Sequence, residues 1–276
     1  MTKKEISSAR GDVEVSREPL IQARDISMRF GGLTAVDQVS VDFYAGELVG
    51  IIGPNGAGKT TFFNTISGVL RPTSGRLLLA GKNLTGQRPH RYAQQGLART
   101  FQTPRVFTDI SVLSNIEFGL KFAGRRRKRY WFWGDETSVP WALRDAGGIL
   151  SLIGLAQVAQ LPAAAITPSQ QRLLEIGMAL ATRPKMLLLD EVAAGLTEGE
   201  LEEMARLITR LRDELNLVVV WIEHAVGTLL RYVDRVIVLH QGQKIADGKP
   251  IDIIHDRVVI EAYLGDEVLE LGQDLR

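Results

Sequence analysis

An α/β fold around a buried, mostly parallel β-sheet is predicted by three short apolar runs and by a glycine-rich stretch that follows the first of them. The runs are Leu48–Ile52, Met186–Leu189 and Leu217–Ile222. Unbroken apolar runs of this length are typical of strands buried on both faces of a parallel sheet. Each run ends in polar residues. Because ligands bind beyond the carboxyl ends of such strands, we expect the three endings to form one site.

The composition limits what else the chain can be. With 276 residues, of which 45% are apolar, we expect one globular unit with an embedded subdomain. The 33 Lys and Arg residues and 32 Asp and Glu residues leave a net charge of +1, which gives no global attraction to nucleic acid or lipid. Because there is no cysteine, disulfides and thiolate metal sites are excluded, and we expect a cytoplasmic location.

Two segments bear on the relation to a membrane. Residues 1–19 are polar and lack the apolar stretch of a secretory signal, so we expect a flexible N-terminal segment. The uncharged segment 146–166 is interrupted by Gln157, Gln160 and Pro162, which argues against a membrane span and favours a buried helix followed by a loop. We therefore expect the protein to dock on a membrane if it works at one.

The first apolar run leads into the pattern G-x-x-x-x-G-K-[ST], which is formed by Gly53-Pro54-Asn55-Gly56-Ala57-Gly58-Lys59-Thr60. In this pattern the glycines let backbone N–H groups surround the phosphates of ATP, and a following helix points its positive end at them. We expect Lys59 to neutralise the β- and γ-phosphates, Thr60 to bind Mg²⁺, and Thr61 to belong to the same nucleotide site. The alternative is an ordinary glycine turn.

Two helices are predicted from apolar spacing. Phe62, Ile66 and Val69 recur at helical spacing directly after the glycine-rich pattern, which predicts the helix that this pattern requires. A longer helix is predicted over residues 199–215. Its apolar face, which we expect to pack on the sheet, consists of Leu201, Met204, Leu207, Ile208 and Leu211.

The second and third apolar runs each end in polar residues that can carry chemistry. Asp190 and Glu191 follow the second run, where a carboxylate is costly unless a cation or its water is close by. We therefore predict that Asp190 belongs to the Mg²⁺ shell and that Glu191 polarises the water that attacks the γ-phosphate. The alternative is a solvated acidic strand end. Glu223 and His224 follow the third run.

In their order and spacing these residues resemble the ABC ATPase family, from about residue 20 to residue 267. The resemblance implies a P-loop NTPase fold with a RecA-like core, an antiparallel β subdomain and a helical subdomain. Residues 20–249 would form the nucleotide-binding domain, with the core at 20–102 and 183–249 and the helical subdomain at 103–182. Residues 250–276 would be a C-terminal extension.

Three further site residues are implied by the resemblance alone. Phe30 matches the aromatic residue that stacks on adenine in the family, although a lone Phe is more often part of a core. Gln102, in Arg99-Thr100-Phe101-Gln102, matches the glutamine that senses Mg²⁺ and the γ-phosphate and touches the membrane subunit. His224 matches the histidine that contacts the γ-phosphate across a dimer, whereas an isolated histidine at a strand end is more often structural.

The family signature Leu-Ser-Gly-Gly-Gln is altered in this chain, where Ile166-Thr167-Pro168-Ser169-Gln170 stands in its place. Thr167 as N-cap, Pro168 at the first helical position and Gln170 at the third predict a capping box ahead of an apolar helix. The resemblance implies that Thr167, Ser169 and Gln170 contact a nucleotide held by a second ATPase chain. We hypothesise that the altered signature weakens that partner site. Thr197 stands where many relatives have Asp, in a loop linking the paired sites.

The ending Val259-Ile260-Glu261-Ala262-Tyr263-Leu264-Gly265 is similar to that of ATPase subunits of branched-chain amino acid importers, and Arg29-Phe30-Gly31-Gly32 agrees with this subgroup. This resemblance implies ATP and Mg²⁺ as cofactors. It also implies integral membrane permease subunits, a second ABC ATPase chain, a solute-binding protein, and a place on the cytoplasmic face of the membrane. The solute would be a branched-chain amino acid or a related urea, amide or aromatic acid.

Two rival functions are compatible with the sequence. One is a nucleotide-binding regulatory subunit that does not hydrolyse ATP, suggested by the altered signature. The other is a soluble ABC ATPase acting on ribosomes or DNA, which the absence of paired cassettes and long coiled coils disfavours. The basic and aromatic segment Arg125-Arg126-Arg127-Lys128-Arg129-Tyr130-Trp131-Phe132-Trp133 could meet anionic lipid or a membrane subunit, or form a solvated loop.

Overall fold

The computed structural model of the protein describes residues 18–127, 139–223 and 226–263. Its larger sheet has six strands in the order β10-β9-β3-β8-β7-β6. All neighbours are parallel except β10, which runs antiparallel to β9. The strands are β3 (Leu48–Ile52), β6 (Leu97–Arg99), β7 (Met186–Asp190), β8 (Val218–Ile222), β9 (Arg235–His240) and β10 (Gln243–Gly248).

The three apolar runs of the sequence form the middle of this sheet. They are β3, β8 and β7, which lie side by side in parallel and are buried along their whole length. Their carboxyl ends therefore meet at one edge, as predicted. Asp190 is the last residue of β7, and Gly53 directly follows β3.

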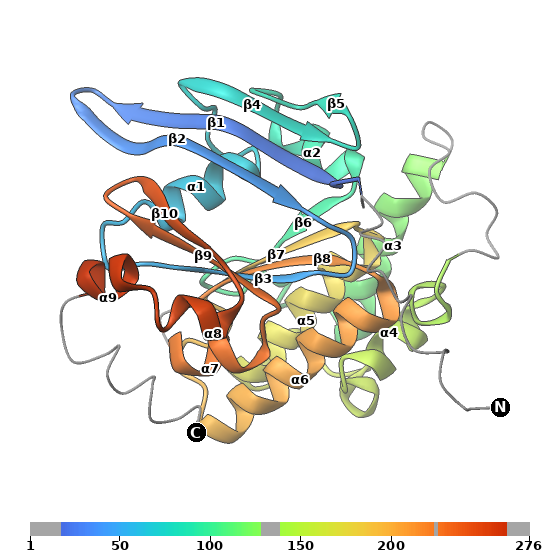
Figure 1. Cartoon of the computed structure of the whole chain (residues 1–276). Helices are drawn as coiled ribbons and strands as arrows, with labels where there is room; N and C mark the ends of the chain where they lie inside the picture. Colours follow the sequence, from blue (N-terminus) through green and yellow to red (C-terminus); the bar gives the residue numbers. More distant parts are fainter. Residues whose placement is uncertain (1–17, 128–138, 224–225, 264–276) are drawn as a thin grey trace, which may run out of the picture.

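A second, antiparallel sheet covers one side of the first. Its order is β2-β1-β4-β5, formed by β1 (Ile21–Phe30), β2 (Leu33–Phe43), β4 (Ser74–Leu79) and β5 (Lys82–Asn83). Helix α1 (Lys59–Ile66) lies between the sheets, and α2 (Pro89–Gln95) lies beside them (Figure 1). Phe62 and Phe63 of α1 are fully buried in the core that this layer shares with β3. This core fixes α1 directly behind the glycine-rich turn.

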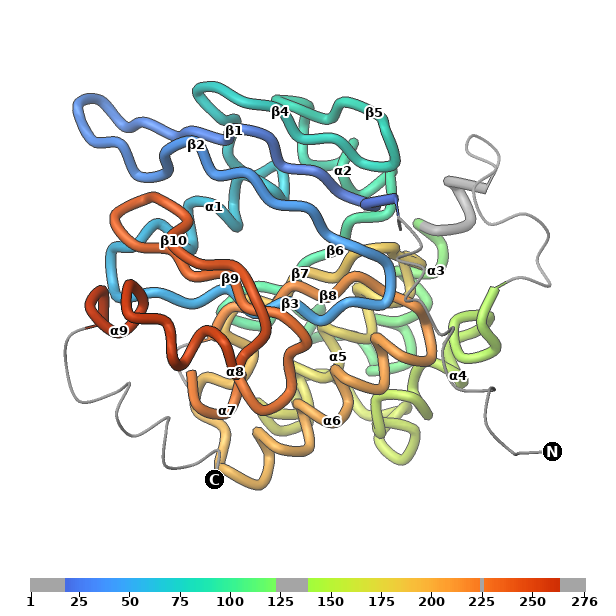
Figure 2. Tube along the Cα trace, in the orientation of Figure 1, coloured from blue at the N-terminus to red at the C-terminus, as the bar shows by residue number. Residues whose placement is uncertain are grey.

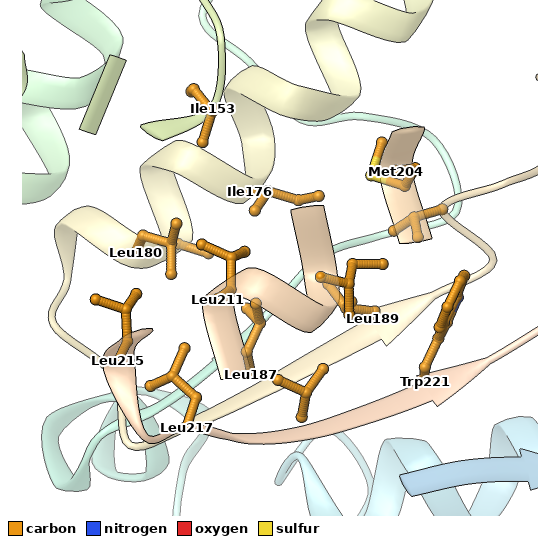
Figure 3. Close-up of a cluster of buried hydrophobic side chains, with 14 of the residues drawn as sticks. Ile153, Ile176, Leu180, Leu187, Leu189, Met204, Leu211, Leu215, Leu217 and Trp221 are labelled. Atoms are coloured by element: carbon orange, nitrogen blue, oxygen red, sulfur yellow. The ribbon is translucent and has the colours of Figure 1, made fainter. Parts of the chain in front are cut away.

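The other side of the six-stranded sheet is covered by helices. These are α5 (Pro168–Ala181), α6 (Glu198–Leu215), α7 (Val226–Tyr232), α8 (Pro250–Ile253) and α9 (Arg257–Tyr263). Figure 3 shows Ile176 and Leu180 of α5 and Met204 and Leu211 of α6 packed together with β7 and β8. The apolar face predicted for residues 199–215 is therefore the face that α6 buries.

The remaining helices form a separate group beyond β7 and β6. They are α3 (Val112–Arg127) and α4 (Ala146–Leu152), with single turns at Trp141–Leu143, Ala156–Val158 and Ala163–Ala165. The segment 146–166 is thus a short buried helix followed by loops, as predicted. Within the described ranges, no helix is long and apolar enough to cross a membrane.

One helix prediction was wrong in its extent. α1 ends at Ile66, so Val69 lies beyond the helix and is 48% exposed. Gly68 follows the C-cap with a φ of 76°, the left-handed conformation that ends helices and favours glycine. Because the helix ends before Gly68, the three-residue spacing from Ile66 to Val69 does not reflect a helix.

Some predictions fall outside the residues that the structure describes. These are the flexible segment up to residue 17, residues 128–133 of the basic and aromatic segment, His224, and the end of the chain from residue 264.

Candidate active site

The turn between β3 and α1 requires glycine at two positions. Gly53 has a φ of 152°, and a Cβ there would lie 2.1 Å from the carbonyl oxygen of Leu239. Gly58 has a φ of 96°, and its Cβ would lie 2.4 Å from the carbonyl oxygen of Ala35. Larger residues at either position would displace the neighbouring backbone. The turn therefore keeps the tight form in which backbone N–H groups can face an anion.

The turn is also held from outside by the hairpin between β9 and β10. The Gly242 N–H donates to the carbonyl oxygen of Ala57 over 3.0 Å, and the Asp37 N–H donates to the carbonyl oxygen of Gly242 over 2.8 Å. Figure 2 shows the hairpin of β10 lying against β2 and close to the start of α1. Both sheets therefore fix the glycine-rich turn.

The side chain of Lys59, the first residue of α1, extends back over the turn. Its Nζ donates to the carbonyl oxygens of Gly53 over 2.5 Å and of Pro54 over 3.2 Å. Burial lowers the pKa of the Lys59 ammonium, and the negative charge of Glu191 opposes that shift. A phosphate would offer this cation a stronger partner than two neutral carbonyl groups.

A pocket of about 560 Å³ opens in front of the turn. Its mouth includes Phe30, which is 47% exposed at the end of β1. An exposed aromatic ring beside a phosphate-sized turn is suited to stacking on a base. The other lining residues are Leu33, Thr34, Ala35, Asn55, Gly56, Ala57, Gly58, Lys59, Thr60, Thr61, Glu191, Gln241 and Gly242.

Glu191 brings a carboxylate to this pocket from the end of β7. Its backbone has a φ of 49°, a left-handed conformation that is uncommon for a residue with a side chain. Its N–H donates to the carbonyl oxygen of Ile222, the last residue of β8, over 3.0 Å. The turn out of β7 is thus held by the neighbouring strand. Strained backbone of this kind clusters at functional sites.

Gln102 lies against Glu191. Its Nε2 donates to Oε2 of Glu191 over 2.6 Å, joining residues 89 positions apart in the chain. The sequence suggested each residue separately, one through its strand end and the other through resemblance. The structure brings them together at the edge of the pocket.

Asp190 is more deeply buried than Glu191, with 7% of its surface exposed. Burial raises the pKa of its carboxyl group, and the positive charge of Arg99 opposes that shift. The hydroxyl of Thr60 and the carboxylate of Asp190 are oxygen ligands of the kind that Mg²⁺ prefers. Mg²⁺ is usually held by one or two carboxylates together with nucleotide phosphates rather than by an all-protein cage. The donor chemistry of these two side chains therefore fits Mg²⁺.

The altered signature lies at the start of α5 and does not line this pocket. Thr167 and Gln170 form the predicted capping box: the Gln170 N–H donates to Oγ1 of Thr167 over 3.2 Å, and the Thr167 N–H donates to Oε1 of Gln170 over 3.0 Å. The Ser169 hydroxyl lies 3.1 Å from that of Thr167. None of these three residues lines the pocket in front of the chain's own glycine-rich turn.

Buried charged residues behind the pocket were not predicted. Arg99 forms an ion pair with Asp190, and Glu175 of α5 accepts hydrogen bonds from the backbone N–H groups of Phe101 and Arg105. Glu223 accepts from the Ala193 N–H over 2.7 Å. Arg99 stood in the sequence beside Gln102, but nothing in the sequence paired it with a carboxylate 91 positions away.

Comparisons with known families agree with this geometry. The sequence model of the family described as ABC transporter matches residues 36–194. A second model, described as branched-chain amino acid ATP-binding cassette transporter, matches residues 243–268. The first covers the glycine-rich turn, Gln102, the altered signature and Glu191. The second covers β10 and the helices that follow it.

Two curated relatives are similar over nearly their whole length. The high-affinity branched-chain amino acid transport ATP-binding protein BraF of Pseudomonas aeruginosa is 37% identical over 254 residues, which cover 90% of this chain and 98% of BraF. The corresponding protein LivG of Escherichia coli is 38% identical over 255 residues, covering 90% and 99%.

A solved structure, the ADP conformation of an ATP-binding cassette of an ABC transporter, has a TM-score of 0.75 and 30% identity. It matches over 90% of this chain and 100% of its own. A nucleotide-free cassette gives a TM-score of 0.74 at 30% identity. The predicted ABC ATPase architecture is thereby confirmed.

Proposed function

Because this chain belongs to the ABC transporter family as an ATP-binding subunit of the branched-chain amino acid type, we propose that its pocket binds Mg-ATP and hydrolyses it to drive solute uptake. ABC subunits of this type are ATPases, and the relatives carry the name of branched-chain amino acid transport proteins. The comparisons give no support to a purely regulatory subunit. The substrate is a branched-chain amino acid or a related small polar solute.

The carrying observation is the hydrogen bond between Gln102 and Glu191 at the edge of the pocket that contains Lys59. The glycine-rich turn holds the phosphates through backbone N–H groups, and Lys59 moves its charge from backbone carbonyls to the β- and γ-phosphates. Phe30 stacks on the base at the mouth. Together these contacts account for nucleotide binding.

Hydrolysis requires a water aligned with the γ-phosphorus. Glu191 lines the pocket and accepts that water's hydrogen bond, while Gln102 holds the Glu191 carboxylate in position. Thr60 and Asp190 would hold Mg²⁺, which would supply positive charge against the phosphates. His224 would contact the γ-phosphate from the chain segment after β8.

The partners follow from the family. ABC subunits of importers dimerise and work with membrane permease subunits, so we propose a second ATPase chain, two membrane subunits and a solute-binding protein outside the membrane. Thr167, Ser169 and Gln170 would face the nucleotide of the second ATPase chain. The protein would lie on the cytoplasmic face of the membrane.

The membrane subunits have a candidate docking surface. Five apolar side chains are substantially exposed: two on α3, two in the segment before it, and that of Leu161. Two of them, Phe107 and Phe118, have ring centroids 5.0 Å apart in an edge-to-face arrangement. We name this set the α3 apolar surface; it consists of Phe107, Ile110, Phe118, Phe122 and Leu161, which are 36–57% exposed.

The test separates binding from turnover in two variants. Glu191→Gln keeps the side chain's size and the phosphate contacts, so ATP affinity should be retained while turnover falls by about 10²- to 10⁴-fold. Lys59→Ala removes the buried cation, so ATP affinity itself should fall by about tenfold or more. Calorimetric binding of ATP and release of phosphate measure the two quantities.

Two substitutions on the surface serve as matched controls. Glu203→Gln on α6 and Lys121→Ala on α3 make the same chemical changes at exposed positions outside the pocket. Both should leave binding and turnover unchanged. Full ATPase activity in Glu191→Gln would contradict the role of Glu191, and ATP binding that does not respond to Lys59→Ala would contradict the pocket as the nucleotide site.

A further inference from the structure

Arg99 is a largely buried cation that pairs with Asp190. It is the last residue of β6, and its side chain is only 12% exposed. Its guanidinium lies 5.1 Å from the ring centroid of Phe63 on α1 and 4.9 Å from that of Phe101. Two aromatic contacts to one guanidinium restrict the plane in which it can present its N–H groups.

The N–H groups of Arg99 reach the end of β7, the end of α1 and the carbonyl of the next residue in the chain. Nη2 donates to Oδ2 of Asp190 over 3.0 Å. Nη1 donates to Oδ1 of Asn64 over 2.8 Å and to Oγ of Ser67 over 2.9 Å, both at the end of α1. Nε donates to the carbonyl oxygen of Thr100 over 3.3 Å. Each of the three nitrogens therefore has an oxygen partner.

These contacts join the carboxylate at the end of β7 to the helix of the glycine-rich turn. α1 begins at Lys59, with Thr60 next, and the partners of Nη1 of Arg99 lie at its other end: Asn64 in the last turn and the C-cap Ser67. Asp190 is thus held by a group that is itself fixed to α1. The pair is largely shielded from water, since the Asp190 side chain is 10% exposed.

An ion pair this deeply buried does not by itself stabilise a protein. Removing two charges from water costs several kcal/mol per ion, and the mutual attraction of the ions often only balances that cost. A buried arginine that also contacts two rings and a second helix is a costly way to satisfy one carboxylate. The presence of Arg99 here is better explained by the orientation that it imposes on the Asp190 carboxylate.

We propose that Arg99 is a positioning residue for metal binding, which holds the Asp190 carboxylate through Oδ2 and fixes it relative to Thr60 on α1. This inference rests on the proposed function, because Asp190 and Thr60 are the residues that would hold Mg²⁺. Groups that hydrogen-bond a metal-binding carboxylate set its direction, and their loss typically reduces metal affinity by about 10- to 100-fold.

The test measures metal affinity apart from nucleotide affinity. Binding of a fluorescent ATP analogue to the full chain is first measured in EDTA, and Mg²⁺ is then titrated at fixed nucleotide. In Arg99→Met, nucleotide affinity in EDTA should stay within about twofold, while the Mg²⁺ midpoint should rise about tenfold or more. Mn²⁺ binding followed by electron paramagnetic resonance gives the same midpoint without any turnover.

Arg105→Met is the matched control. Arg105 lies 4.4 Å over the ring of the same Phe101, yet its side chain is exposed and has no ion pair with Asp190 in the described part of the chain. The substitution Arg105→Met removes one cation and one aromatic contact close to Arg99. The Mg²⁺ midpoint of Arg105→Met should equal that of the unsubstituted chain.

Arg99→Lys keeps the charge but not the fork that reaches Asp190 and α1 together. The Mg²⁺ midpoint of Arg99→Lys should also rise, but by less than that of Arg99→Met. If Arg99→Met does not fold, Arg99→Lys alone decides the question. A midpoint unchanged or lowered in the folded Arg99 variants would overturn the inference and leave the proposed function standing. Loss of Mg²⁺-dependent nucleotide binding in the unsubstituted chain would overturn both.

Discussion

Glu175 is a buried carboxylate beneath the segment that carries Gln102. Its two oxygens accept the N–H groups of Phe101 over 3.3 Å and of Arg105 over 3.0 Å, and 6% of its surface is exposed. Burial raises the pKa of the Glu175 carboxyl to about 7, although both backbone hydrogen bonds and the charges of Arg105 and Arg172 oppose the shift. This group therefore titrates near neutral pH.

The raised pKa predicts a pH dependence of stability. Because the folded-state pKa of about 7 exceeds the unfolded value of 4.5, this group's contribution is fully present below about pH 4.5 and is lost as pH rises through 7. The loss amounts to about 3 kcal/mol of unfolding free energy. Glu175→Gln, which stays neutral, should remove this decline. Urea unfolding at intervals from pH 5 to 8 measures it.

Glu203→Gln on the exposed face of α6 is the control for that series. It replaces a glutamate by the same amide in water, so its unfolding free energy should run parallel to that of the unsubstituted chain. A Glu175→Gln curve parallel to both would show that Glu175 is ionised throughout the range.

Single residues mark the limit of what the sequence predicts. Lys59 and Asp190 could be proposed from the sequence because each stands in or beside a local pattern with a known chemical need. The ion pair of Arg99 with Asp190 could not, since it depends on β6 lying next to β7. The left-handed backbone of Glu191 could not be predicted either, because that conformation is expected from sequence only at a glycine or an asparagine.

At the scale of elements, local rules worked best at helix starts. The capping box of Thr167 and Gln170 was readable because its residues are four positions in a row. α6 has a second such box between Thr197 and Glu200, with the Glu200 N–H donating to Oγ1 of Thr197 over 3.4 Å. Backbone and side-chain hydrogen bonds from Thr197, together with one from Ser169, lower the pKa of Glu200. The two helix starts thus touch each other.

Removing either cap should lower the unfolding free energy by a similar amount. Thr167→Ala deletes the acceptor of the Gln170 N–H, and Thr197→Ala deletes that of the Glu200 N–H. Each should lower the unfolding free energy by about 1 kcal/mol, with the urea midpoint lowered and the denaturant slope unchanged. Thr167→Ser and Thr197→Ser retain a hydroxyl and should recover most of the loss. Equal losses in the Ser and Ala variants would contradict the capping role.

At the scale of the whole molecule, strand order is what the sequence leaves open. Apolar runs predicted that β3, β7 and β8 are buried, but only the fold shows β8 inserted between the other two. That order sets Glu191 beside Ile222 and thereby beside the pocket. The hydrogen bond of Gly242 to Ala57 in the glycine-rich turn likewise joins residues 185 positions apart, which no local pattern can predict.

The α3 apolar surface also belongs to this scale, because it has meaning only in an assembly. Phe118 and Phe122 are one helical turn apart on α3, while the opposite side of that helix packs on α5 through buried residues such as Ile116. Singly exposed apolar residues need no explanation, but five in one region indicate an interaction site. The family supplies the partner, since ATP-binding subunits of importers work with membrane permeases.

Phe118→Asp should therefore separate assembly from nucleotide binding. A charge at the most exposed of these five positions should weaken association with detergent-solubilised permease subunits by about tenfold or more. ATP binding by the isolated chain should not change, because Phe118 does not line the nucleotide pocket. Val258→Asp, at a position 53% exposed on α9, is the control and should leave both unchanged. Undiminished copurification of Phe118→Asp with the permease would mean that the membrane subunits dock elsewhere on the chain.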